Sequence, residues 1–313
     1  MKKLLIYLKD YKRESILGPF FKMLEATFEL LVPLVMAAII DVGIAQRDGG
    51  YILRMCLLIA ALGAVGLIST ITAQYYAAKA AAGFAKKLKH ALFSHIQRFS
   101  YSELDSLGAP TMITRMTSDA NQVQTGINLT LRLLLRSPFV VFGAMIMAFT
   151  IDSRAALVFA GVIPVLSLVV FGIMLWCVPL YKKVQAKLDR VLGMTRENLT
   201  GARVIRAFCK EEDETREFSA RNEELERAQK FVGRISALMN PATYAIINIA
   251  VAGLIWIGAI RVGAGLITQG AVVALYNYMS QILIELIKLA NLIITITRSI
   301  ASGNRIQDVF EIR

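Results

Sequence analysis

Residues 155–181 read AALVFAGVIPVLSLVVFGIMLWCVPLY, a run without a single charged side chain. A helix needs roughly 20 apolar residues to cross the hydrocarbon core of a bilayer, and this run is longer. Other charge-free runs lie on both sides of it, at residues 55–78, 137–151, 235–260 and 262–284, with a weaker one at residues 30–40. Six such runs predict an all-α membrane protein with six transmembrane helices.

The composition agrees with this prediction. Hydrophobic residues make up 56% of the 313 residues, and the mean hydropathy is +0.56. Soluble domains are usually about 45–50% apolar, so the excess indicates a lipid environment. The net charge of +12 could suggest nucleic acid as a partner. However, the basic residues are spread over segments that alternate with the apolar runs, and no separate basic module stands apart from them. We therefore expect no nucleic-acid binding.

The distribution of Lys and Arg predicts the topology. Residues 2–13, 79–136 and 182–234 and the residues after the last run are rich in Lys and Arg, with thirteen in 182–234 alone. The three other connections, 41–54, 152–154 and the turn at Arg261, are poor in them. Positively charged loops stay on the cytoplasmic side. This alternation predicts a multi-pass protein of the cell membrane with both termini in the cytoplasm.

The two long basic segments are predicted to be helical arms. Residues 182–234 contain few helix breakers and would form roughly 80 Å of helix, or two antiparallel arms of roughly 40 Å. Residues 79–136 are similar but are interrupted by YSELDSLGAP at 101–110, where Gly and Pro predict a helix stop and restart. We expect the two arm pairs to reverse near residues 100–110 and 207–218, which gives six transmembrane helices with long cytoplasmic helical extensions.

The first residues are predicted to lie on the membrane surface. Residues 1–14 would form an amphipathic helix with Leu4, Leu5 and Leu8 in the bilayer and its lysines near anionic lipid. The six-helix domain with its arms would then occupy residues 15–300.

Several motifs point to one family. The most specific are ENLTGARVIRAFCKEEDE at residues 197–214 and MITRMTSDANQV within residues 103–124. Two further matches are IIDVGI at 39–44 and IASGNRIQDVFEI at 300–312. With these motifs, the chain resembles the transmembrane domain of ATP-binding cassette (ABC) exporters, the class that holds bacterial multidrug exporters and lipid flippases. The resemblance covers essentially the whole chain.

The resemblance implies two partners, a nucleotide-binding domain and a second transmembrane half. No Gly-x-x-x-x-Gly-Lys-Ser/Thr motif occurs, so no loop here is expected to hold a nucleotide, and no catalytic residues are assigned. ATP and Mg²⁺ would bind to an associated nucleotide-binding domain, toward which residues 301–313 would begin a linker. A second transmembrane half, identical or different, would complete a bacterial transporter.

By the same resemblance, the two arm reversals would be coupling helices that dock on the ATPase domain. The residues expected to make this contact are Tyr101, Leu104, Asp105, Phe208, Glu212 and Phe218. For Phe208 and Phe218, buried contacts between the arms are an equally acceptable interpretation.

A polar stripe runs along the sixth apolar run. Six residues fall within about 120° of one another on a helix: Asn277, Gln281, Glu285, Lys288, Asn291 and Thr295. Charges at the centre of a bilayer cost several kcal/mol against lipid, so this stripe should face protein or water. We interpret it as a wall of the translocation pathway. The alternative is an interhelical polar clasp in which Glu285 and Lys288 pair.

A matching face is predicted for the third span. Its members are Asn121, Gln124, Thr125, Asn128, Arg132 and Arg136. The two arginines could form a basic rim of a vestibule that favours anionic or amphipathic cargo, or could simply extend toward lipid headgroups. Asn248 in the fifth span is a further candidate pathway residue, and Pro241 nearby could kink that helix.

Two other patterns have simpler interpretations. Ser69, Ala73, Ala77, Ala81 and Ala85 recur every four residues, which favours close helix packing. His90 and His95 lie on different helix faces without a carboxylate or cysteine cluster, so we expect no metal site.

We therefore expect the membrane domain of an ATP-driven exporter that moves amphipathic or lipid-like compounds, with drugs and peptides among the candidates, by alternating access. Two other classes of protein stay open. One is a non-transporting receptor or regulatory subunit that uses the arms as signalling rods, and the other is an ion-coupled carrier with Glu285 as its proton site.

Overall fold

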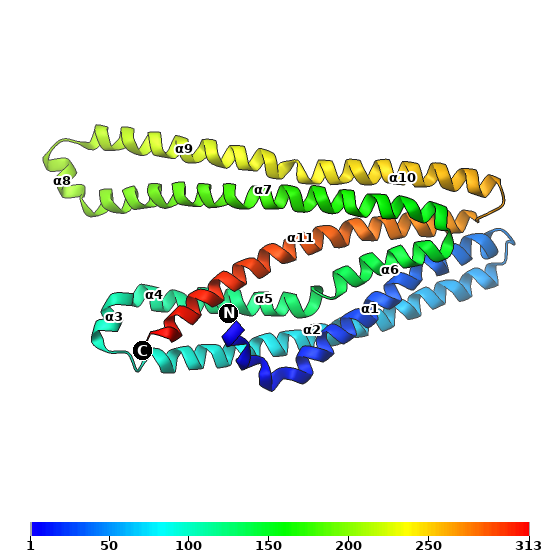
Figure 1. Ribbon diagram of the computed structural model, residues 1–313, viewed down its shortest axis with the longest axis horizontal. Helices are drawn as coiled ribbons and strands as arrows, with labels where there is room; N and C mark the ends of the chain where they lie inside the picture. The colour runs from blue at the N-terminus through cyan, green and yellow to red at the C-terminus, as the bar shows by residue number, and fades with distance from the viewer. Residues whose placement is uncertain (1, 313) are drawn as a thin grey trace. The chain divides into compact units, whose positions relative to one another are not determined.

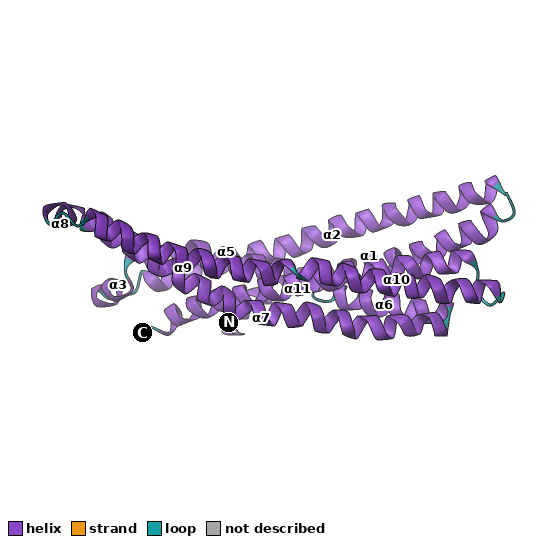
Figure 2. Ribbon diagram, turned by 90° about the horizontal axis from the view of Figure 1, so that it is seen from above, coloured by secondary structure: helices purple, strands orange, loops and turns teal. Residues whose placement is uncertain are grey.

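A computed structural model describes residues 2–312, and these residues form helices and no strands (Figures 1 and 2). Six helical stretches are long and apolar enough to cross a membrane: Lys3–Ile44, Gly49–Ile96, Ala109–Ile151, Ser153–Thr200, Glu211–Gly263 and Gln269–Glu311. The predicted fold class, an all-α protein with six membrane-spanning helices, is confirmed.

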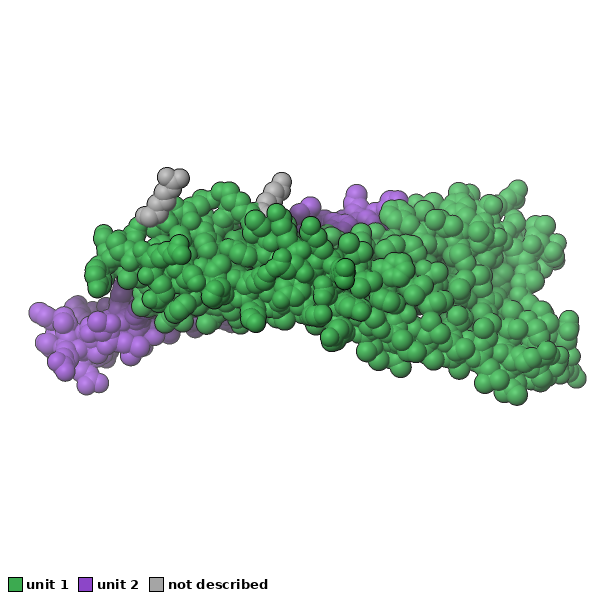
Figure 3. Space-filling view, turned by 90° about the horizontal axis from the view of Figure 1, so that it is seen from below, with its two compact units in different colours: residues 1–161, 250–313 green, residues 162–249 purple. Residues whose placement is uncertain are grey.

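The chain divides into two compact units (Figure 3). The first contains Met1–Gly161 together with Ala250–Arg313, and the second contains Val162–Ile249. Both boundaries fall inside long helices, because α7 (Ser153–Thr200) and α10 (Met239–Gly263) each contribute to both units. Each unit is described separately below.

The first unit begins with two long antiparallel helices. A 3-10 helix, η1 (Lys2–Tyr11), leads into α1 (Lys12–Ala38), which continues as a π-helix, η2 (Ile39–Ile44), before α2 (Gly49–Ile96) returns along it (Figure 1). The small-residue stripe from Ser69 to Ala85 is buried, and the backbone of α1 at Gly18 packs against Ala77. The packing predicted for this stripe is confirmed.

The third span is built from several pieces. After α2 come α3 (Tyr101–Leu107), α4 (Ala109–Thr114), the π-helical η3 (Arg115–Asp119), α5 (Ala120–Leu133) and α6 (Arg136–Ile151). The turn at Leu134 and Leu135 separates α5 from α6, whereas the polar face predicted for this span assumed one continuous helix. Pro138 explains the break, because it has no N–H to donate to the carbonyl of Leu134 four residues earlier.

The last helix, α11 (Gln269–Glu311), packs along α1, α5 and α6 of the first unit. In the arm region its buried residues Ile306 and Val309 join an apolar core with side chains from η1, α2 and α5, among them Leu4, Phe84 and Val123. This core gives the arm of the first unit a packed interior of its own.

Polar contacts secure the turns at the charge-poor end of the first unit. Asp41 on η2 accepts a hydrogen bond from the backbone N–H of Gly270 at 2.7 Å, at the start of α11. Asp152 accepts from the N–H of Ala155 at 2.8 Å and forms an ion pair with Arg261 at 2.5 Å. Arg261, in a connection poor in Lys and Arg, is thus paired.

The second unit is a pair of long antiparallel segments joined by a short helix. The latter part of α7 is followed by α8 (Ala202–Ala207), α9 (Glu211–Ala237) and the first part of α10. Lys187 of α7 donates to Glu224 of α9 at 2.7 Å, which ties the two sides together. A break at Leu238 separates α9 from α10, at the position where Pro241 cannot donate to the carbonyl of Ala237.

Candidate functional site

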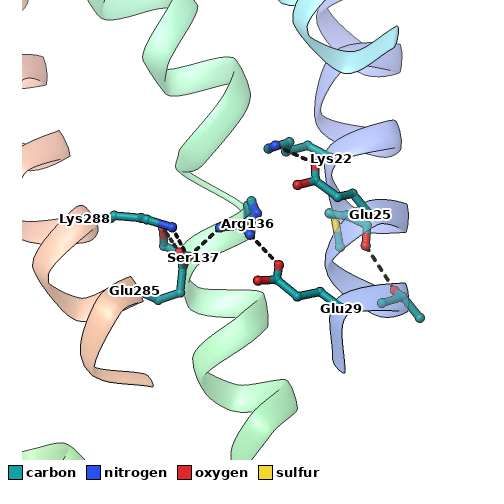
Figure 4. A network of polar contacts seen from close by, with 9 residues as sticks. Lys22, Glu25, Glu29, Arg136, Ser137, Glu285 and Lys288 are labelled. Carbon is teal, nitrogen blue, oxygen red and sulfur yellow. Dashed lines mark hydrogen bonds and ion pairs between the residues drawn. The ribbon is translucent and has the colours of Figure 1, made fainter. Parts of the chain in front are cut away.

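The most connected polar group of the first unit is centred on Arg136 at the start of α6 (Figure 4). Its two terminal amino groups donate to Glu285 of α11 and to Glu29 of α1, each at 2.5 Å. Glu285 also accepts from Ser137 at 2.9 Å and from Lys288 at 2.8 Å. Three helices are therefore joined through one guanidinium group.

The network extends along α1 and is balanced in charge. Lys22 forms an ion pair with Glu25 at 2.5 Å, one helical turn from Glu29 (Figure 4). With Arg136 and Lys288 on one side and Glu29 and Glu285 on the other, the group contains three basic and three acidic side chains. Such a set can be buried in a membrane domain because each charge has an opposite neighbour.

The helix geometry brings these residues to one level. Glu285 lies 16 residues after the start of α11 at Gln269, which is about 24 Å along the helix. Arg136 lies 15 residues before the end of α6 at Ile151, or about 22 Å from the same charge-poor end. Both distances are shorter than the roughly 30 Å of a bilayer's hydrocarbon core, so the network belongs to the membrane-spanning part.

Burial makes the pairing energetically important. Glu285 is only 3% exposed and Arg136 only 6%, so neither charge can be solvated by water. Removing one partner of a buried pair leaves an uncompensated charge, which typically costs about 3–5 kcal/mol. Glu285 and Lys288 pair as the interhelical clasp predicts, and their role in a pathway wall stays a prediction. Arg136 takes part in the same clasp, and its place at a basic rim stays a prediction.

The other stripe residues on α11 divide between packing and exposure. Asn277 is half-buried and donates to the carbonyl of Val273 within its own helix at 3.1 Å. Gln281 and Thr295 are half-buried, whereas Lys288 and Asn291 are exposed. Lys288 and Asn291 are therefore accessible beside the clasp.

The candidates on the other spans are less closely connected. Arg132, Gln124 and Asn128 of α5 are half-buried, Thr125 is exposed, and Asn121 accepts a hydrogen bond from Lys89 of α2 at 2.8 Å. Asn248 lies exposed on α10 in the second unit.

A groove of about 320 Å³ lies beside the clasp. Glu25, Glu29 and Arg136 line one part of it, and Gly63 and Gly66 of α2 line another. The charged network is therefore reached from the side of the α1–α2 pair.

The residues predicted to couple to an ATPase domain lie on and next to two short helices. In the first unit, α3 begins with a capping box in which Ser100 and Glu103 hydrogen-bond each other's backbone, and it ends at Gly108 with a φ of 71°. This is the helix stop and restart predicted from the sequence. Tyr101 is 89% exposed, Asp105 is also exposed, and Leu104 packs against the arm core.

In the second unit, Phe208 follows α8 and is 73% exposed, Glu212 is exposed in the first turn of α9, and Phe218 is half-buried. Cys209 adopts a φ of 50°, a left-handed conformation that reverses the chain. Lys210 donates to Asp213 at 2.8 Å, and this hydrogen bond raises the pKa of the Lys210 ammonium group. The tip of this arm therefore presents an aromatic ring beside a fixed, paired lysine.

The two histidines have separate positions. His90 is exposed on α2, and the ring of His95 lies 3.2 Å from the carbonyl oxygen of Val309 and 3.1 Å from that of Ile312. His95 therefore ties the end of α2 to the end of α11.

Comparison with known proteins identifies the family. The model of the ABC transporter transmembrane region matches residues 15–286, which is most of the chain. The chain belongs to this family. The resemblance inferred from the motifs is thus confirmed, and the six apolar helices are those of an ABC transporter transmembrane region.

Curated relatives of this ABC transporter transmembrane region are similar over nearly all of its length. An uncharacterized ABC transporter ATP-binding protein of Mycobacterium tuberculosis is 29% identical over 97% of this chain and 52% of its own length. A similarly described protein of Bacillus subtilis is 29% identical over 99% of this chain and 54% of its own length. An ATP-dependent lipid A-core flippase of Desulfotalea psychrophila is 28% identical over 71% of this chain and 39% of its own length. The chain spans about half the length of the first relatives named.

Sequence reasoning missed part of the site of this ABC transporter transmembrane region. The sequence analysis assigned no role to Lys22, Glu25 and Glu29, which lie just before the weakest apolar run. A signal was nevertheless present, because charged residues inside a span need opposite partners and the third and sixth spans contain Arg136 and Glu285.

Proposed function

We propose that this ABC transporter transmembrane region is the membrane-spanning part of an ATP-driven exporter of amphipathic or lipid-like compounds. One observation supports this proposal best. The helix α7 has 48 residues, or about 72 Å, more than twice the thickness of the hydrocarbon core. Helices this long, with exposed aromatic residues next to their reversals, are suited to carry force between a membrane domain and a domain outside the membrane.

The force would come from an ATPase domain that binds ATP and Mg²⁺. Tyr101 on α3 and Phe208 beyond α8 are the contacts we assign to it, because large exposed aromatic side chains are typical anchors of protein interfaces. The names of the mycobacterial and Bacillus relatives, which describe ATP-binding proteins, support such a partner. A second transmembrane half, identical or different, would complete the pathway.

The orientation follows from the charges. The arms are the segments richest in Lys and Arg, so both they and the two termini would lie in the cytoplasm of a bacterial cell, with the protein in the plasma membrane. The turns at Asp41, Asp152 and Arg261 would face the outside.

The pathway would run beside the clasp. Lys288 and Asn291 would contact cargo from α11, and Arg132 from α5, while Arg136 and Glu285 hold the helices in register. Alternate opening of the pathway to the two sides of the membrane would require groups of helices to move as rigid bodies. A clasp that fixes the helices of one group to each other favours such a movement. The flippase among the relatives makes lipid-like cargo the first class to test.

The clasp also bears on the ion-coupled carrier. A proton site must exchange its proton with water, but Glu285 is buried and accepts hydrogen bonds from Arg136, Ser137 and Lys288. This arrangement favours a structural carboxylate, and hence an ATP-driven machine over a proton-driven one.

Transport by the chain joined to its ATPase domain, in vesicles with a fluorescent lipid analogue, tests the proposal. We expect transport that needs hydrolysable ATP. Tyr101→Ala and Phe208→Ala should each reduce it several-fold, and Phe231→Ala, which removes an exposed phenylalanine from the last third of α9, should leave it unchanged. Transport that follows a proton gradient and ignores ATP would refute the proposal, and binding without any transport would favour the receptor.

A further inference from the structure

The groove between α1 and α2 has one charged wall and several apolar ones. Its volume is about 320 Å³, and its charged side chains are Glu25 and Glu29 of α1 and Arg136 of α6. The apolar part of its lining comes from both α1 and α2: Phe28, Val32, Leu62 and Leu67. A groove of this kind suits a molecule that has a polar end and a hydrocarbon end.

The groove lies at the depth of the hydrocarbon core. Glu29 precedes the end of η2 at Ile44 by 15 residues, which is about 22 Å of helix. On α2, Gly63 and Gly66 follow the helix start at Gly49 by 14 and 17 residues, or about 21 and 26 Å. All three distances start from the charge-poor end and are shorter than the roughly 30 Å of a hydrocarbon core. A molecule in the groove would therefore lie inside the membrane.

The α2 side of the groove is open and apolar. A side chain added at Gly63 or Gly66 would have no atom within 4 Å of its first carbon, so the bare backbone leaves space there. Leu67, which lines the groove, is exposed, and so are Ile68 and Ile71 on the same stretch of α2. The apolar part of α2 is also the least buried of the six spans, at 6%. This side of the groove therefore suits a hydrocarbon chain.

Glu29 is the carboxylate of the groove with the least charge compensation. Glu25 has its own partner, Lys22, at 2.5 Å. Among the side chains that the structure describes, Glu29 pairs only with Arg136, which it shares with Glu285. The side chain of Glu29 is 40% exposed, and a carboxylate has about four positions at which it can accept a hydrogen bond. Glu29 therefore has room for a second cationic donor.

A buried donor in the same groove also lacks a partner. The Nε–H group of Arg136 is buried and has no hydrogen-bond acceptor among the described residues, although Arg136 is only 6% exposed. Burial of an N–H group without an acceptor costs free energy, so such a group in a folded protein calls for a ligand or another explanation. Because Arg136 lines the groove, an oxygen atom of a bound molecule would supply the missing acceptor.

We infer that the groove binds an amphipathic amine, whose ammonium group donates to Glu29, whose neighbouring oxygen accepts from Arg136, and whose hydrocarbon chain lies along Leu67. This ligand class rests on the proposed function, in which such a compound is the cargo, and narrows that cargo from amphipathic to cationic compounds. A basic rim would favour anionic cargo, whereas this groove sets two carboxylates against one guanidinium group.

Binding to the chain joined to its ATPase domain, in phosphatidylcholine nanodiscs without ATP, tests the inference. The radiolabelled probes are an amino alcohol, a diol and a hydroxy acid with the same twelve-carbon chain, and binding to empty nanodiscs is subtracted. Each probe has a hydroxyl oxygen for Arg136, but only the amino alcohol is cationic at neutral pH. We expect it to bind about tenfold tighter than the diol, because a hydrogen bond to a charged group typically contributes at least this factor. The hydroxy acid should bind most weakly.

Two variants locate the site. Glu29→Gln keeps an acceptor for Arg136 but removes the charge, so the amino alcohol should bind about tenfold more weakly and no tighter than the diol. Gly63→Leu extends into the open part of the groove and should weaken the binding of all three probes several-fold. The matched control Gly172→Leu makes the same exchange at an exposed, open position of α7 and should leave binding unchanged.

Other outcomes would overturn the inference. Equal binding of the amino alcohol and the diol, or tightest binding of the hydroxy acid, would show that Glu29 does not select a cation. An unchanged affinity in Gly63→Leu, or an equal loss in Gly172→Leu, would place the probe outside the groove. Absence of saturable binding for every probe would mean that the second transmembrane half, and not cargo, fills the groove.

The binding assay and the transport assay can fail separately, because binding is measured without ATP. ATP-driven transport of the lipid analogue without any preference for the amino alcohol would refute the cationic cargo and leave the proposed function intact. A preference for the amino alcohol that depends on Glu29, in a protein that transports nothing with ATP, would support the binding site and refute the proposed function.

Discussion

The clasp between α6 and α11 makes a prediction that can be worked from its geometry. In Arg136→Met, Glu285 is left buried with only Lys288 and Ser137 as partners. In Glu285→Met, the guanidinium keeps only Glu29, whose side chain is 40% exposed. Breaking a buried pair costs about 3–5 kcal/mol, and the remaining partners place each single variant near 3 kcal/mol.

The double variant Arg136→Met with Glu285→Met should behave differently. It removes both buried charges and leaves apolar side chains of similar size, an exchange that is often neutral or stabilising. The losses of unfolding free energy in the two single variants sum to about 6 kcal/mol, whereas we expect the double variant to lose less than about 3 kcal/mol of this free energy. The difference is the interaction free energy of the pair.

Thermal unfolding in detergent, followed by the fluorescence of the two tryptophans, measures these effects. At about 2 °C per kcal/mol for a chain of this size, each single variant should melt roughly 6 °C lower than the unmodified protein. A double variant as unstable as the sum of the two single variants would refute the reasoning, because the two side chains would then act independently. Single variants with unchanged melting temperatures would contradict the burial on which the estimate depends.

Two further predictions concern close contacts in the same unit. Gly270→Ala should lower the free energy of unfolding by about 1–3 kcal/mol, because the added methyl group would lie 2.6 Å from a carboxylate oxygen of Asp41. In the same thermal assay Gly63→Ala should be neutral or slightly stabilising, because no atom lies within 4 Å of the added methyl group. Asp119→Asn should loosen the arm, since buried Asp119 accepts hydrogen bonds from Arg115 and Arg305. Hydrogen exchange should then rise in η3 and the end of α11, and unchanged exchange would contradict this.

The elements of this fold are predictable because the bilayer imposes a simple rule on the sequence. Charge-free runs long enough to span it must be helices, so six spans could be assigned without any knowledge of their contacts. The stripe from Ser69 to Ala85 predicted which face of α2 is buried, since small residues permit the close approach seen at Gly18. Ser100, Glu103 and Gly108 likewise predicted a local helix start and stop, which depends only on neighbouring residues.

The pairing of Arg136 with Glu285 could not be predicted in the same way, because 149 positions separate the two residues. Periodicity shows which side chains share a face of one helix, but not which face of another helix lies opposite. Pro138 was visible in the sequence, yet proline is also accommodated without a break at Pro164 and Pro179 of α7. The packing around each proline decides between a bend and a break.

Polar side chains fix α11 to its neighbours at three levels along its length. Its buried Glu285 holds α6 by an ion pair with Arg136, and its buried Ser299, about four turns further on, donates to the backbone of α5 at 2.6 Å. The arm half of the helix is then tied to η3 by Arg305 and Asp119. A helix fixed at three levels moves as one body with its neighbours, so a displacement at the arm should reach the level of Lys288 undiminished. Any opening of a pathway at that level must therefore occur between groups of helices, and not by bending of α11 within its group.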